Sequence, residues 1–479
     1  MASPTPRHDL INGPIGPTLL LFALPTLGSN ILQSLNGSIN TIWVGRFLGE
    51  NALAATSNAN IIMFLIFGAV FGFGMAATVL IGQSIGRGDP DGARRAFGAA
   101  TGLVLGGAIV MAAFGWFLAP AILRVLATPP EAMPLALAYL RVTFLGVPAS
   151  MLLVLLMMSL RGVGDAMTPL WFMILSVALD AGLNPVFILG LGPAPQMGIA
   201  GSATATLIAN HVAALGLLAT IYARRLPIRL SGKELRYLLP GRALIGAIVG
   251  KGLPMGAQML VMSFGGLTMV GLVNRLGVDT VAAYGVSQQL WTYIQMPAMA
   301  IGAAVSAMAA QNIGAGAWDR VGGITRAGLL CTLLITGVMV GAVLAFDRPV
   351  MALFLGGESA ALPIARHIQL IATWNFAVFG LTMVLFATVR ANGAVLVPLA
   401  ILLVAFYPAR LGFAIGMQPV LGADALWWSF PVGSLTSLAL ATAYYRWGGW
   451  RRGAMMRPRE AQEHALSGGE PAGRLQPNG

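Results

Sequence analysis

Asp180 is the carboxylate whose place in the sequence most clearly suggests chemistry. It lies in the middle of an apolar stretch, Met167 to Leu191, that is long enough to cross a membrane. A charged aspartate at the centre of a bilayer costs on the order of 2.5–3.5 kcal/mol even on a lenient insertion scale. Such an acid usually faces a water-filled cavity, so Asp180 is a candidate for binding a proton or a metal cation.

The composition predicts that this acid sits in a protein that is almost entirely embedded in lipid. Hydrophobic residues make up 57% of the 479 and charged residues only 9%, whereas a soluble protein carries about 25% charged residues. Backbone groups in lipid must be bonded within their own segment, so the apolar runs are expected to be helices. Twelve such runs are expected, near 16–41, 52–82, 93–118, 134–160, 166–191, 197–223, 244–272, 280–311, 322–346, 361–389, 394–416 and 423–446.

The basic residues predict an orientation. If both termini are cytoplasmic, most of the 28 Lys and Arg lie on the cytoplasmic side, as the positive-inside rule requires. A multi-pass protein of the bacterial inner membrane follows from this reading. The basic linker is expected to touch anionic lipid headgroups, and the net charge of +12 is not attributed to nucleic-acid binding because no soluble domain carries it.

The chain repeats itself at an offset of about 228–229 residues. Leu24-Pro25 matches Leu253-Pro254, the Gln83–Gly88 run matches Gln311–Gly316, and Pro169 matches Pro398. An offset of six helices places both halves in the membrane in the same sense, which is typical of a transporter with its path at the interface between two bundles. An inert relic of gene duplication is the alternative. The expected parts are 1–13 (cytoplasmic segment), 14–223 (first lobe), 224–243 (basic linker), 244–446 (second lobe) and 447–479 (disordered tail).

The repeated motifs resemble those of the multidrug and toxic compound extrusion (MATE) family. The likeness rests on Pro25, the Asn40-Thr-Ile-Trp-Val-Gly-Arg run, Ala54-Ala55, Gly82–Gly88 and Arg161-Gly162-x-Gly164 with Pro169, together with their counterparts in the second half. It covers about 16–446 and is nearest to the bacterial damage-inducible-protein-like branch. The resemblance implies a secondary antiporter that exports organic, probably cationic, compounds in exchange for H⁺ or Na⁺ by alternating access.

The resemblance also implies a cation site, with one departure from the family. Related members carry an acid in the first helix and an Asn-x-x-x-Asp-Pro pattern in the fifth. Here Asn40 stands at the first position, and the fifth helix reads Asp180 to Asn184-Pro185 with the two residue types exchanged. Thr206 falls at the position of the family's threonine. Residues four apart share a helix face, so the exchange moves the carboxylate by about one turn.

The coupling ion stays open between two choices. A hard cation such as Na⁺ could use oxygens from Asp180, Asn184, Asn40 and Thr206. A proton needs only Asp180, and the single carboxylate favours proton coupling. The alternative cation site known from the family's other branch is rejected, because the corresponding second-half helices offer Gln258 and Asn375 and no acid.

Other polar residues are candidates for contacting the substrate, although interhelical hydrogen bonds account for such residues generically. Arg410 lies deep in the run 394–416, and its side chain is expected to extend toward the membrane surface. The candidate substrate residues are Asn36, Gln33, Gln258, Gln288 and Asn375.

Enzyme signatures and resident cofactors are not expected. The four His are scattered and there is one Cys, Cys331, so no metal centre is expected beyond a possible Na⁺ at Asp180. The expected partners are a small organic molecule and membrane lipid, and the protein is expected to be a monomer. The competing function is a flippase for lipid-linked glycans of the same superfamily.

Overall fold

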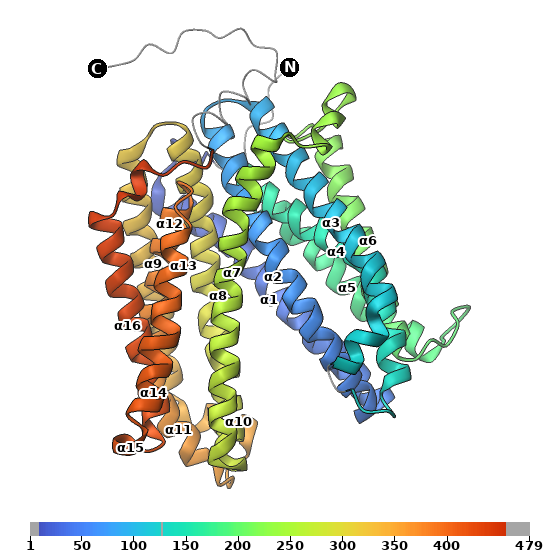
Figure 1. The fold of residues 1–479 in the computed structure, drawn as a ribbon, viewed down its shortest axis with the longest axis vertical. Helices are drawn as coiled ribbons and strands as arrows, with labels where there is room; N and C mark the ends of the chain where they lie inside the picture. The colour runs from blue at the N-terminus through green and yellow to red at the C-terminus, as the bar shows by residue number, and fades with distance from the viewer. Residues whose placement is uncertain (1–8, 126–127, 457–479) are drawn as a thin grey trace. The chain divides into compact units, whose positions relative to one another are not determined.

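The computed structural model describes residues 9–125 and 128–456, and these contain helices and no strand. Figure 1 follows the chain through its numbered helices. The first half comprises α1 (Ile15–Leu48), α2 (Glu50–Gly86), α3 (Pro90–Val125), α4 (Met133–Val163), α5 (Met167–Leu189), α6 (Ile199–Ala223) and the 3₁₀ helix η1 (Gly232–Leu238).

The second half repeats the pattern with more interruptions. It comprises α7 (Arg242–Val273), η2 (Asn274–Leu276), α8 (Val278–Gly314), α9 (Trp318–Ala345), α10 (Asp347–Leu355), α11 (Ala361–Ala372), α12 (Asn375–Arg390), α13 (Leu396–Val404), η3 (Ala405–Leu411), α14 (Gly412–Gly416), α15 (Gln418–Leu421), α16 (Asp424–Trp447) and η4 (Gly449–Arg452).

The membrane-spanning character expected from the sequence is confirmed. Ten helices among the described residues are long and apolar enough to cross a membrane, and the bent pair α11 and α12 brings the number to 11. That pair meets at 42° and replaces the continuous run expected over 361–389. The last expected run forms α16, a helix of 24 residues that lies outside this set. An all-helical, two-repeat membrane protein is therefore the observed fold class.

Two compact units divide the chain, and they do not coincide with the two halves of the sequence. One comprises Met1–Leu32, Gly164–Leu170 and Gly256–Gly453; the other comprises Gln33–Val163, Trp171–Met255 and Ala454–Gly479. Helices α1 and α7 are each divided between the two units. We call them the second-half unit and the first-half unit, after the repeat that supplies most of each.

Aromatic side chains form the centre of the second-half unit. Trp291 of α8 packs against Phe376 at 5.0 Å and Phe430 at 4.9 Å between ring centroids, and Tyr284 stacks near Trp427 at 5.9 Å. These rings are buried. Large aromatic rings bury much area at low entropic cost, so they fix α8, α12 and α16 as one body.

The segment after α16 differs from the disordered tail expected over 447–479. Residues 457–479 lie outside the described part, but Gly449–Arg452 forms the turn η4 with Trp450 only 1% exposed. Asn392 donates hydrogen bonds to the carbonyls of Trp450 (2.9 Å) and Arg451 (3.1 Å). A buried indole and two bonded carbonyls supply the order that composition alone did not indicate.

Candidate cation-binding site

The four residues expected to form a cation site lie in contact within the first-half unit. Asp180 and Asn184 come from α5, Asn40 from α1 and Thr206 from α6. Asp180 and Asn184 are fully buried, and Asn40 and Thr206 are half-buried. The structure thus gathers these side chains from three helices, and their role as cation ligands stays a prediction.

Local sequence explains how the helices come close enough. A Cβ at Gly201 would lie 2.5 Å from the backbone carbonyl of Phe187, so only glycine lets the start of α6 approach α5 this closely. Thr206 follows 1.4 turns later. Pro185 lies inside α5 and lacks an N–H, so one backbone bond of that helix is missing beside Asn184.

The Asp180 carboxylate accepts hydrogen bonds on both oxygens. Asn40 Nδ2 donates to Oδ2 at 2.9 Å, while Thr206 Oγ1 and Asn184 Nδ2 both donate to Oδ1 at 3.0 Å. The side chain of Asn36 also interacts with this carboxyl group. None of the ion pairs found in the described part of the chain includes Asp180. The charge is therefore stabilised by neutral donors alone, and an incoming cation would meet no competing basic side chain.

Two amide oxygens beside Asp180 have no hydrogen-bond donor. Asn184 Nδ2 donates to Asn40 Oδ1 (2.8 Å), to the Asp180 carbonyl (2.9 Å) and to the Asp180 carboxylate, yet Asn184 Oδ1 is buried without a partner. Asn36 Oδ1 is also buried without one. An unsatisfied buried acceptor costs about 1–3 kcal/mol, so such oxygens are suited to a cation that the fold admits.

A second polar contact lies one helical turn from the site. Ser176 of α5 donates to Asn210 Oδ1 at 3.1 Å, and Asn210 Nδ2 donates to Ser150 Oγ of α4 at 2.8 Å. Ser176 precedes Asp180 by four residues and Asn210 follows Thr206 by four, so each pair shares a helix face. Polar side chains therefore continue along α5 and α6 from the site.

The candidate substrate residues are scattered by comparison. Gln33 and Gln288 are exposed on α1 and α8. Gln258 is buried, donates to the carbonyl of Val395 (3.3 Å) and accepts a bond from Arg390 (3.1 Å). Asn375 is buried, donates to the carbonyl of Ala372 and accepts a bond from Ser434 (2.6 Å). The last two are satisfied within their own unit, so only Asn36 of the five lies with the Asp180 group.

Arg410 is where the sequence-based expectation was wrong. Its side chain is 8% exposed and does not extend to a surface; its guanidinium carbon lies 3.6 Å from the ring centroid of Phe430 and 5.4 Å from that of Phe406. Tyr139 of α4, within electrostatic range of Asp180, was not anticipated either. Both contacts join residues from separate helices, and no local pattern announces them.

Comparison with known proteins matches this architecture. The MatE family model matches residues 25–186 and 254–415, one copy in each half. The probable multidrug resistance protein YoeA of Bacillus subtilis is 32% identical over 90% of this chain and 93% of that protein. The FAD transporter of Shewanella oneidensis is 26% identical over 73% of this chain and 76% of that protein.

A solved structure supports the fold. An outward-facing multidrug resistance MATE family transporter of the MOP superfamily superposes with a TM-score of 0.84 at 20% identity, covering 93% of this chain and 98% of that one. Two family-model copies together span more than half of the sequence, and the repeat, the helices and the relatives agree. The chain therefore belongs to the MatE, or multidrug and toxic compound extrusion, family, and is a multi-pass membrane transporter rather than an enzyme.

Proposed function

We propose that this protein exports organic, cationic compounds in exchange for an inward-moving cation that binds at Asp180. The observation that carries the proposal is a fully buried carboxylate, inside a membrane helix, held by amide and hydroxyl groups without a basic partner among the described residues. The name of the YoeA relative supports efflux of drugs. Residues 14–223 and 244–446 would act as the two lobes of an alternating-access cycle.

The chemistry at the site is a change of charge. Ionised Asp180 leaves one negative charge in a low-dielectric setting, and a bound proton or Na⁺ removes it. The free energy of the site then depends on whether the ion is present, which links occupancy to the conformation that the helices adopt. Moving one charge across 100 mV is worth about 2.3 kcal/mol, enough to drive a useful outward gradient.

The choice of ion follows from the donors at Asp180. A proton would need the carboxyl group alone, and a single acid favours this ion. Sodium would need several oxygens, for which Asn184 Oδ1, Asn36 Oδ1, the Thr206 hydroxyl and Asn40 are at hand. We propose proton coupling, with sodium as the competing ion, and both require Asp180.

The substrate is the second open choice. Because one relative is named as an FAD transporter, an anionic dinucleotide is a candidate substrate beside cationic drugs. The flippase alternative would instead require transport of a lipid-linked glycan. Inner-membrane location with both termini in the cytoplasm is part of the proposal and rests on the distribution of Lys and Arg.

A reconstituted system tests the proposal. Purified protein in proteoliposomes receives an imposed pH gradient, an imposed Na⁺ gradient, or neither, and the flux of a cationic dye is measured, with FAD and a lipid-linked glycan as separate substrate arms. We expect gradient-driven dye transport that Asp180→Asn abolishes.

A matched control keeps this result specific. Asp424→Asn removes a carboxylate that is bound to exposed His367 (2.8 Å) at the end of α16 and should leave transport unchanged. Dye flux that persists in Asp180→Asn with its gradient dependence intact would refute the role of Asp180. Transport of the glycan alone would favour the flippase.

A further inference from the structure

A cavity of about 680 Å³ opens on the second-half unit between α9, α12, α16 and η4. Six leucines line it, among them Leu330, Leu381 and Leu438, and two of the six are strongly exposed (Leu330 at 61% and Leu333 at 49%). The volume lies in the range of about 300–1,000 Å³ usual for small-molecule sites. The cavity is thus an apolar groove that reaches the outer surface of its helices.

Three arginines meet this cavity. Arg326 comes from α9, Arg446 from the last turn of α16 and Arg451 from η4, and all three are exposed. No acidic residue lines the cavity, and no ion pair in the described part of the chain involves these three guanidinium groups. The groove therefore combines an apolar wall with an uncompensated positive rim.

The positive rim is held in place by its backbone. Trp450 is buried, donates its indole N–H to the carbonyl of Tyr445 (2.8 Å) and stacks on that ring at 5.3 Å. Asn392 binds the carbonyls of Trp450 and Arg451, and the Arg451 guanidinium lies 5.6 Å from the Trp450 ring centroid. A preformed rim loses little conformational freedom when it binds a ligand.

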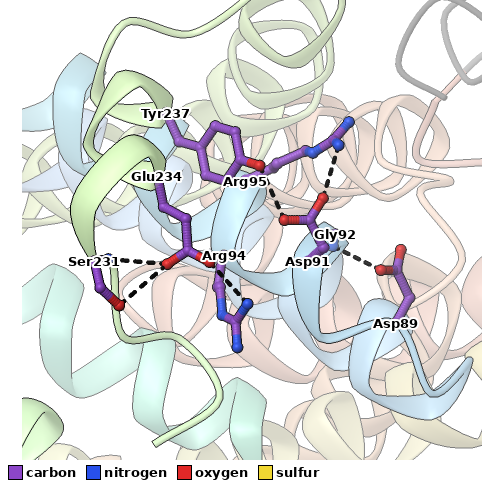
Figure 2. A network of polar contacts seen from close by, with 8 residues as sticks. All are labelled: Asp89, Asp91, Gly92, Arg94, Arg95, Ser231, Glu234 and Tyr237. Atoms are coloured by element: carbon purple, nitrogen blue, oxygen red, sulfur yellow. Dashed lines mark hydrogen bonds and ion pairs between the residues drawn. The ribbon is translucent and has the colours of Figure 1, made fainter. Parts of the chain in front are cut away.

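The first-half unit closes the corresponding face with its own chain. There η1 packs on α3, where Tyr237 contacts Gly98 and the Leu238 carbonyl faces Gly102. Figure 2 shows the polar contacts that hold η1: Arg94 pairs with Glu234 (2.9 Å), and Tyr237 donates to Asp91 (2.9 Å). A Cβ at Gly102 would lie 1.8 Å from the Leu238 carbonyl, so glycine is required for this cover.

The second-half unit cannot be covered in the same way. At the repeat offset of 228 residues, Gly98 corresponds to Arg326 and Gly102 to Leu330. Both replacements line the cavity. The two glycines that admit a protein segment in the first half are thus replaced by a cation and a leucine in the second, which suits a ligand that is charged at one end and apolar along its length.

We propose that this cavity binds an anionic phospholipid, with its phosphate at Arg326, Arg446 and Arg451 and an acyl chain along the leucines. Guanidinium groups bind phosphate through paired N–H donors. The proposed topology places these arginines in the cytoplasmic leaflet, where anionic lipids attract basic side chains. The site is distinct from the Asp180 group and does not depend on the direction or ion of transport.

Lipid binding to the purified full-length protein tests the proposal. Native mass spectrometry would count phosphatidylglycerol and phosphatidylcholine bound at equal concentration, and brominated acyl chains would report proximity by quenching tryptophan fluorescence, which Trp450→Phe should diminish. We expect preferential binding of phosphatidylglycerol, reduced about fivefold for each arginine replaced by glutamine and on the order of 100-fold for all three.

Two further variants separate a seated lipid from surface charge. Arg225→Gln/Arg229→Gln/Arg452→Gln removes three arginines outside the cavity, including the neighbour of Arg451, and should leave the preference intact. Leu438→Trp fills the groove without changing the charge and should reduce binding of phosphatidylglycerol. Monodisperse elution and an unchanged melting temperature establish that each variant is folded.

Several results would overturn the proposal. These are an equal loss of preference in the control triple variant, equal binding of phosphatidylcholine, and full binding by Leu438→Trp. Displacement of the lipid by inorganic phosphate at millimolar concentration would assign the rim to a free anion, and displacement by a transported dye would assign the groove to substrate.

Discussion

The fifth membrane helix of the first repeat and its counterpart in the second each carry a charged residue in the middle, but the charges have opposite signs. Pro169 of α5 corresponds to Pro398 of α13, which puts Asp180 opposite Ala409 by sequence offset. The counterpart continues into η3, a π-helix. A π segment accommodates one extra residue, so Arg410 takes the place along the helix that Asp180 holds on α5.

The partners of these two charges differ in kind. Asp180 is surrounded by amide and hydroxyl donors that can rearrange around an ion. Arg410 is stacked on Phe430 and Phe406, and Gly433 leaves room for its Cβ at 3.0 Å. A carboxylate can take up a proton or a metal ion, whereas a guanidinium stays protonated under all physiological conditions.

The comparison teaches that one repeat has kept an exchangeable charge while the other has a permanent one. Burying Arg410 costs on the order of 2.5–3.5 kcal/mol, and a desolvated cation–π contact returns about 2 kcal/mol. Arg410 therefore contributes mainly to packing in its unit. Substitutions in the first repeat should change ion coupling, and those in the second should change stability.

The largest expected effect is on ion coupling. Asn184→Leu keeps a similar volume but removes the amide that binds Asn40 and Asp180. Hydrogen bonds to charged groups are worth about 1.5–3 kcal/mol, so the initial rate of gradient-driven transport should fall by about 10–100-fold. Flux in proteoliposomes measures this, with the exposed amide variant Asn60→Leu as control; equal rates in the two variants would contradict the site.

The next effect is on stability in the second repeat. Arg410→Ala loses the ring contacts and leaves a cavity, which should lower the unfolding free energy by about 3 kcal/mol. Arg410→Lys should not restore it, because an ammonium group is more strongly hydrated and does not stack as a plane. Thermal unfolding in detergent measures both, and the ratio of ion-driven to undriven flux should stay as in the wild type. A changed ion dependence would remove the distinction between the repeats.

A matched pair of hydroxyl substitutions sharpens the comparison. Thr206 corresponds to Ser434 at the offset of 228 residues. Thr206→Val removes one donor to the Asp180 carboxylate (3.0 Å) and should change the apparent affinity for the coupling ion about tenfold, with Thr206→Ser restoring it. Ser434→Ala removes a bond to Asn375 and should leave ion affinity unaltered. Ion titrations of the transport rate decide, and equal shifts in both would be the contrary result.

The smallest effect is expected for a carboxylate outside the membrane spans. The Arg366 guanidinium, bound to Asp347 at 2.6 Å, holds the pKa of that carboxyl below its usual range. The resulting stability is present above the unfolded-state pKa of about 3.9 and is lost as pH falls through the folded-state value. Asp347→Asn should therefore cost at most about 1 kcal/mol at pH 7 and nothing at the acidic end. Melting temperatures between pH 7 and pH 3 measure this, and a loss that persists at the acidic end would contradict it.

The sequence by itself determined the fold class and most of the residues of the candidate site. Apolar runs longer than about 20 residues leave the backbone only the helix, and the repeat offset shows two equivalent halves. Asp180 stands out because a carboxylate in such a run is costly. The spacing to Asn184 is local, so their shared helix face could be predicted.

Only the tertiary structure decided how residues from different helices meet. Asn36 joins the Asp180 group while Gln258 and Asn375 are satisfied elsewhere, although all three are polar residues in apolar helices. Arg410 turns inward because Phe430, on another helix, offers it a ring, and Gly98 and Gly102 acquire meaning once η1 rests on them. Hydropathy and spacing specify the faces of one helix, whereas packing between helices depends on close contacts that no single segment records.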